Sequence, residues 1–201
     1  MIFDAVVLAG GRASRLGGLS KPTELGRDGK TLLDIAIGAA AGARHIVVVG
    51  EVAERPGIVV TRESPPFSGP VAALAAGLDA IARDASPLTL VLAADQPDAA
   101  AGVEALVNAL EESTRQGLDG ALAVDLDERD QYLLAIYATA SLSLRLSGLT
   151  VADAPMRKLT EGLDLLRVPV PPGAADDVDT WQDAERLGVT RMPAIRMEAA
   201  R

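Results

Sequence analysis

Residues 6–22 read VVLAGGRASRLGGLSKP: an apolar run ending in two glycines, then two arginines, two further glycines and a lysine. The apolar run begins at Phe3 and extends to Leu8, which is typical of a buried strand. Glycines after a strand let backbone N–H groups approach phosphate oxygens, because no Cβ stands in the way. Arg12, Arg15 and Lys21 add positive charge to the same segment. The segment therefore predicts a triphosphate-binding loop at the carboxyl end of the first strand, where α/β folds bind their ligands.

The composition is that of one acidic domain. A chain of 201 residues fits a single domain, and its 49% of hydrophobic residues is ample for a core. A net charge of −9 without a compensating basic face indicates no nucleic-acid partner. The absence of cysteine excludes disulfides, thiolate nucleophiles and cysteine-based zinc sites.

The apolar stretches do not indicate export or a membrane. The first one is interrupted by Asp4 and by Gly10-Gly11-Arg12, unlike a signal peptide. No stretch approaches the ~20 apolar residues that a membrane-spanning helix needs. We therefore expect a cytoplasmic protein with no membrane association, either a monomer or a weak homo-oligomer.

Strand and helix patterns alternate along the chain. Strands are predicted at 3–8, 45–49, 58–61, 88–93, 120–124, 132–137 and 166–170, and helices at 31–42, 71–83, 100–116, 142–149, 156–162 and 180–188. This alternation predicts an α/β fold, a Rossmann-like three-layer α/β/α sandwich with a mostly parallel sheet. Strand 132–137 is expected to be antiparallel, because its short connection from 120–124 leaves no room for a crossover helix. We assign 1–189 to a single domain and 190–201 to a tail whose lack of periodicity is compatible with disorder.

A second candidate feature is the sequence Asp95-Gln96-Pro97, which follows the continuously apolar strand 88–93. The strand carries one carboxylate to its carboxyl end, beside the expected position of the glycine-rich loop. A carboxylate there could hold Mg²⁺ against phosphate oxygens, since this cation prefers oxygen ligands. The alternative is that Asp95 caps the following helix. Together with the glycine-rich loop, metal binding is the favoured interpretation.

A third feature is the acidic run Asp176-Asp177-Val178-Asp179-Thr180. Asp177 and Asp179 alternate across Val178, so both can point to one side of an extended chain. They could complete a metal site with Asp95 if the fold returns them to the same edge of the sheet. A solvated turn, with Asp179 or Thr180 capping the closing helix, is the alternative.

Two further features have ordinary structural explanations. Ser68-Gly69-Pro70 leads into a helix. The free N–H groups at its start could bind an anion, or the segment is an ordinary helix start. His45, the sole histidine, has no serine, cysteine or acidic partner nearby in the sequence, so a structural role is favoured.

In this order, the motifs resemble the nucleotidyltransferase family that includes molybdenum cofactor guanylyltransferase, and the likeness extends to about Gly188. The family's opening Leu-Ala-Gly-Gly, arginine, Leu-Gly-Gly and lysine correspond to Leu8–Gly11, Arg15, Leu16-Gly17-Gly18 and Lys21. Its later motifs look like Gly69-Pro70-Val71-Ala72-Ala73, Asp95-Gln96-Pro97, Gln131-Tyr132-Leu133, Pro155-Met156-Arg157-Lys158 and Asp177-Val178-Asp179-Thr180-Trp181.

The resemblance implies that the molybdopterin phosphate attacks the α-phosphorus of GTP and releases pyrophosphate. It assigns the base and ribose to Leu8, Ala9 and Gly10, and the triphosphate to Gly11, Arg12, Arg15 and Lys21. Glu63, Gly69 and Pro70 would complete the nucleotide site. Asp95 would hold Mg²⁺, and Lys21, Arg15 and Asp95 would be the catalytic residues.

Departures from the family pattern leave the base and the acceptor open. Asp177 and Asp179 replace two asparagines that face the pterin in the family, and could bind either the metal or the acceptor. The same aspartates and Asp95-Gln96-Pro97 are more like the related cytidylyltransferases, whereas Leu8–Gly11 favours guanine. Gly50 stands where the family has an asparagine. The alternatives are CTP, another phosphorylated acceptor, or a non-catalytic nucleotide-binding assembly protein.

Overall fold

The computed structural model describes residues 1–10, 23 and 25–192. Gly11, Arg12, Arg15 and Lys21 lie outside these residues. The described elements, in chain order, are β1 (Phe3–Leu8), β2 (Leu25–Arg27), β3 (Lys30–Thr31), α2 (Leu32–Ala39), β4 (Ile46–Val49), β5 (Val59–Thr61), α3 (Pro70–Ile81), β6 (Leu88–Ala93), α4 (Ala99–Glu112), β7 (Gly120–Val124), β8 (Asp130–Ala138), α5 (Thr139–Ser147), α6 (Met156–Thr160), β9 (Leu165–Pro169), α7 (Trp181–Arg186) and β10 (Thr190–Arg191).

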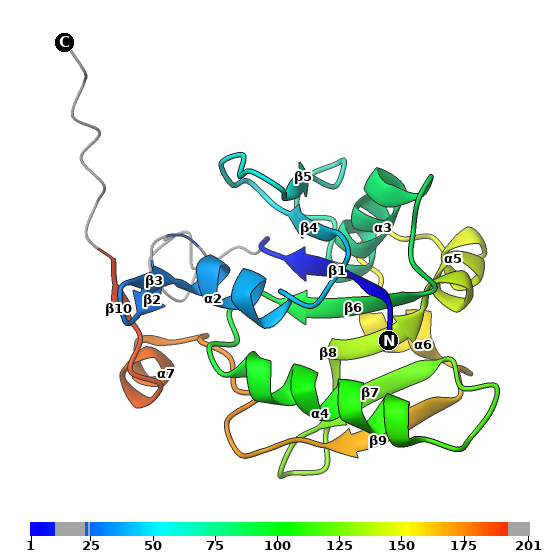
Figure 1. The fold of residues 1–201 in the computed structure, drawn as a ribbon. Helices are drawn as coiled ribbons and strands as arrows, with labels where there is room; N and C mark the ends of the chain where they lie inside the picture. The colour runs from blue at the N-terminus through cyan, green and yellow to red at the C-terminus, as the bar shows by residue number, and fades with distance from the viewer. Residues whose placement is uncertain (11–22, 24, 193–201) are drawn as a thin grey trace.

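The main sheet has the strand order β5-β4-β1-β6-β8-β7-β9. Strands β1, β4, β5 and β6 pair in parallel, and so do β7 and β9. Strand β8 is antiparallel to both β6 and β7, which confirms the orientation predicted from its short connection. The carboxyl ends of β1 and β6 point to the same edge of the sheet, on the left of Figure 1.

Helices cover both faces of this sheet (Figure 1), so the predicted three-layer α/β/α architecture is confirmed. Alternate residues of β1 pack against the helices on opposite faces of the sheet. Ala5 and Val7 pack in a cluster that includes α2 and α4, whereas Val6 and Leu8 pack with α3 and α6. Because both faces are covered, the central strands are apolar throughout.

Most predicted elements are present with shifted ends. Helix α2 begins one residue later than predicted, because Thr31 is its N-cap: the Thr31 hydroxyl accepts a hydrogen bond from the Asp34 N–H at 3.1 Å. Helix α4 ends at Glu112 instead of residue 116, since Ser113 is already extended. Helix α5 begins at Thr139, three residues before the predicted start.

A second, three-stranded sheet in the order β10-β2-β3 was not predicted. Its strands are only two or three residues long, too short to show an alternating pattern. Thr190 and Arg191, which the sequence analysis placed in the tail, form β10 and pair with β2. With α7, the sheet encloses a small core of Leu25, Leu32, Val178, Ala184 and Val189. It lies at the carboxyl-end edge of the main sheet (Figure 1).

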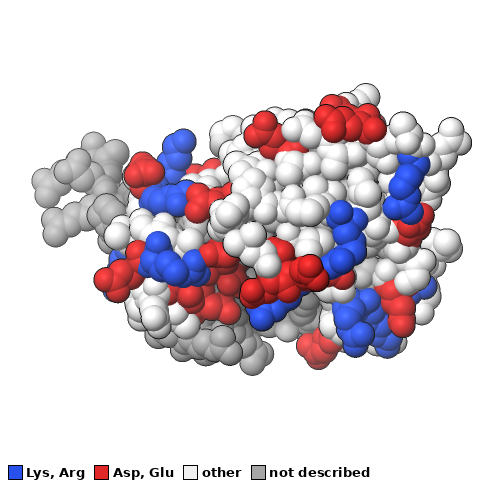
Figure 2. All heavy atoms as spheres, turned by 90° about the horizontal axis from the view of Figure 1, so that it is seen from below, with Lys and Arg blue, Asp and Glu red and all other residues white. Residues whose placement is uncertain are grey.

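Acidic and basic side chains are interspersed on the face of the molecule shown in Figure 2, seen from below. The described residues also form exposed ion pairs, such as Arg115 with Asp164 at 2.8 Å. None of the helices that the structure describes is long and apolar enough to cross a membrane.

Candidate functional site

The exit of β1 lies between the exits of β4 and β6. The Ala9 N–H donates to the Val49 carbonyl at 2.9 Å, and the Ala94 N–H donates to the Leu8 carbonyl at 3.0 Å. Leu8 and Ala9 are buried, whereas Gly10 is exposed. The chain therefore leaves the core at the position predicted for nucleotide binding.

Gly50, at the exit of β4, lies against this point. A Cβ on Gly50 would be 2.9 Å from both the carbonyl carbon and the oxygen of Ala9. The two backbones approach so closely that a side chain at position 50 would require one of them to move.

Asp95 follows β6 on the next strand exit and is half-buried. The helix-cap alternative is wrong for this residue, because the N-cap of α4 is Asp98. Asp95 also accepts, through its main-chain carbonyl, a hydrogen bond of 3.0 Å from the Val178 N–H. This bond brings the acidic run next to Asp95, as the metal-site hypothesis requires.

In the acidic run Val178 is fully buried, while Asp177 is exposed and Asp179 is half-buried. This alternation places the two carboxylates away from the core. The cap of α7 is Thr180, whose hydroxyl accepts from the Asp183 N–H at 3.1 Å, so the cap alternative applies to Thr180 and not to Asp179.

The carboxylates do not form a ready-made metal cage. Within the described residues, no group of three or more histidine, cysteine, aspartate or glutamate side chains is arranged to hold a metal ion. Nucleotide-bound Mg²⁺ does not need one, because it takes one or two carboxylates together with phosphate oxygens and waters. A half-buried aspartate at a strand exit fits this requirement.

The loop before α3 is held by its own side chains. Glu63 is buried, and its Oε1 accepts a hydrogen bond of 2.8 Å from the Phe67 N–H. Gly69 is the N-cap of α3, with a φ of 87°, and no side chain caps this helix end. Pro70 follows as the first helical residue. Glu63 thus shapes the loop, and the first N–H groups of α3 have no partner within the helix.

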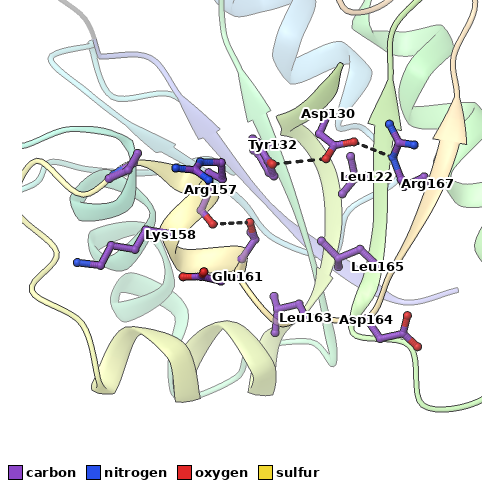
Figure 3. A pocket seen from close by; sticks show the side chains of 12 residues that line it. Leu122, Asp130, Tyr132, Arg157, Lys158, Glu161, Leu163, Asp164, Leu165 and Arg167 are labelled. Atoms are coloured by element: carbon purple, nitrogen blue, oxygen red, sulfur yellow. Dashed lines mark hydrogen bonds and ion pairs between the residues drawn. The ribbon is translucent and has the colours of Figure 1, made fainter. Parts of the chain in front are cut away.

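A cavity of about 570 Å³ lies over β7, β8 and β9, beside α6 (Figure 3). Tyr132 and Arg157, which belong to two of the motifs that resemble the family pattern, line the same end of the cavity. The Asp130 carboxylate accepts two hydrogen bonds in this cavity, from the Arg167 Nε at 2.8 Å and from the Tyr132 hydroxyl at 3.4 Å. Burial, together with the nearby Asp130 carboxylate, raises the pKa of Tyr132.

His45 does have acidic partners, although they are distant in the sequence. Its Nδ1 lies 2.9 Å from Oδ1 of the fully buried Asp4, which also accepts from the Ser86 hydroxyl at 2.9 Å. The carboxylate stands between the serine and the histidine, so this is not the order of a nucleophilic triad. The structural role predicted for His45 agrees with this network at the amino end of β1.

A family model described as the MobA-like NTP transferase domain matches residues 5–167, and the chain therefore belongs to this family. The match begins in β1 and ends in β9, so it spans the main sheet. No curated protein sequence matches the chain.

Three solved structures illustrate the fold. Rv0371c from Mycobacterium tuberculosis H37Rv has a TM-score of 0.71 and 22% identity, covering 93% of this chain and 97% of that one. Molybdopterin-guanine dinucleotide biosynthesis protein A from Archaeoglobus fulgidus has a TM-score of 0.66 and 20% identity, with coverages of 92% and 96%. The 2-C-methyl-D-erythritol 4-phosphate cytidylyltransferase from Thermus thermophilus has a TM-score of 0.61 and 21% identity, with coverages of 93% and 98%.

Proposed function

We propose that this protein transfers GMP from GTP to the phosphate of molybdopterin and releases pyrophosphate. The observation that carries the proposal is the hydrogen bond of 3.0 Å between the Val178 N–H and the Asp95 carbonyl. It sets the acidic run beside the candidate metal ligand, next to the strand from which the glycine-rich segment leaves. Membership of the NTP transferase family supports the same reaction class.

The reaction needs little beyond positioning and neutralisation of charge. An oxygen of the acceptor phosphate attacks the α-phosphorus, a new P–O–P linkage forms, and the bond to the β-phosphate oxygen breaks. Pyrophosphate leaves with the electron pair. The attacking phosphate is already ionised, so no general base is required.

Each residue of the site has a proposed task. Gly11 and Arg12 would cradle the triphosphate, while Arg15 and Lys21 would neutralise the charge that develops on it. Asp95 would hold Mg²⁺, which neutralises phosphate charge when bound. Asp177 and Asp179 would face the acceptor or add a second metal ligand.

Transfer of CMP is the second candidate. The acidic residues of the closing motif favour it, because Asp177 and Asp179 replace the asparagines of the guanylyltransferases. A thermal-shift screen of the four nucleoside triphosphates with Mg²⁺ separates the two, since a bound nucleotide stabilises the folded chain. Greater stabilisation by GTP supports our proposal, and greater stabilisation by CTP supports the alternative.

Pyrophosphate release tests the mechanism. Lys21→Ala and Asp95→Asn should abolish release with molybdopterin as acceptor while leaving the circular dichroism spectrum intact. Lys30→Ala and Asp127→Asn are matched controls, because both residues are exposed. Unchanged release by both site variants contradicts the mechanism, and nucleotide binding by the wild type without release with any acceptor supports a non-catalytic protein.

A further inference from the structure

Arg27, at the end of β2, forms hydrogen bonds with the turn that follows Asp95. Its Nη2 donates to Oδ1 of Asp98 at 2.7 Å, and its Nη1 donates to Oδ2 of the same carboxylate at 3.1 Å. Nη2 also donates to the Pro97 carbonyl at 3.0 Å. These paired hydrogen bonds fix the orientation of the Asp98 carboxylate as well as its distance from Arg27. A single point charge would fix only the distance.

The Asp98 carboxylate is not used as a helix cap. Asp98 is the N-cap of α4, yet its side chain makes no capping hydrogen bond. Both of its carboxylate oxygens accept hydrogen bonds from Arg27 instead. The structure therefore holds the turn between β6 and α4 through β2, an element of the other sheet.

The same side chain also contacts the end of α7, the helix that follows the acidic run. Nη1 of Arg27 lies 3.4 Å from the Leu187 carbonyl, just after α7. Leu25 of β2 and Val178 of the acidic run are both fully buried in the small core. Arg27 thus joins the turn after Asp95 to β2 and to the residue that follows α7, the helix that begins directly after the acidic run.

We propose that Arg27 is a positioning residue of the transfer site: it holds the turn after Asp95 in place relative to β2 and to α7, the helix that follows the acidic run. This inference rests on the proposed nucleotidyl transfer. Arg27 need not touch nucleotide or acceptor. Its side chain is 28% exposed and that of Asp98 is 41% exposed, so the pair is partly screened and should matter more for geometry than for stability.

Substitution of Arg27 should therefore lower turnover more than nucleotide binding. Removing a residue that orients a metal ligand typically costs about 10- to 100-fold in activity or metal affinity. We expect Arg27→Gln to lower kcat by that factor, to raise the Mg²⁺ concentration for half-maximal rate, and to change KM for the nucleotide by less than about threefold. Arg27→Lys keeps the positive charge but loses the paired hydrogen bonds to one carboxylate. Its kcat should therefore lie between those of the wild type and Arg27→Gln.

Arg115→Gln is the matched control. Arg115 also binds both oxygens of one carboxylate, those of Asp164 at 2.8 and 3.0 Å, but at the start of β9 and far from the site in the sheet. It should leave kcat within about twofold of the wild type. An equal fall of kcat in both variants, or an unchanged kcat in Arg27→Gln, overturns the inference.

Amide hydrogen exchange provides a readout that does not depend on turnover. Arg27→Gln should speed exchange at Val178 and in the peptide covering 94–99, and Arg115→Gln should not. If the wild type transfers no nucleotide at all, the proposed function fails. The exchange pattern still tests whether Arg27 holds these segments in place. Unchanged exchange in these peptides overturns the positioning role whatever the activity.

Discussion

Replacing Gly50 by alanine should strain the exit of β1. The new Cβ would lie 2.9 Å from the carbonyl carbon of Ala9, whereas carbon atoms pack at about 3.5–4.0 Å. Either backbone must therefore move by roughly 0.6 Å or more. Neither can move alone, because the Ala9 N–H is bonded to the Val49 carbonyl and the Gly50 N–H to the Thr61 carbonyl.

Overpacking of this kind costs about 1–3 kcal/mol. For a chain of this length that lowers Tm by about 2–12 °C. Because the displaced residue begins the glycine-rich segment, we also expect weaker nucleotide binding, and misplacement by about 1 Å can cost about 100-fold in rate. Differential scanning calorimetry, followed by pyrophosphate release, measures both effects.

Gly38→Ala is the control for the Gly50 variant. Gly38 is exposed in the last turn of α2, and nothing lies within 4 Å of its would-be Cβ. Alanine there should raise stability by about 0.5–1 kcal/mol. The reasoning is refuted if the Gly50 variant melts with the wild type and binds nucleotide equally well.

Two further predictions concern stability alone. Tyr137→Phe should cost about 1–1.5 kcal/mol in urea unfolding, because the buried hydroxyl donates to the Tyr132 carbonyl at 2.9 Å; a cost near zero would mean that water replaces the bond. Asp34 provides the pH dependence: burial raises its pKa, but hydrogen bonds from Thr31 and Arg55 outweigh this and leave the pKa lowered. A lowered pKa means that the stabilisation is present above the ordinary aspartate pKa of about 3.9 and is lost as pH falls through the folded value. Unfolding of the wild type and Asp34→Asn between pH 7 and pH 3 should therefore converge at the acid end, and a constant difference would contradict this.

The main sheet could be predicted because its strands carry a local signal. Strand β6 is continuously apolar since both of its faces are covered, and its predicted bounds, Leu88–Ala93, are those observed. The orientation of β8 followed from the length of one connection. Helix ends were less predictable, because capping at Thr31 and the extended Ser113 depend on individual residues.

The sequence alone singled out the glycine-rich segment, Asp95 and the acidic run as candidates, since each follows an apolar stretch typical of a strand. It could not bring Asp95 and Val178 together, because that contact joins residues 83 positions apart through one backbone bond. Nor could it reveal the small sheet, whose two- and three-residue strands are stabilised by a core assembled from both ends of the chain. Arg27 had no sequence signal for the same reason: its partners, Asp98 and the Leu187 carbonyl, come near it only once the two sheets have formed.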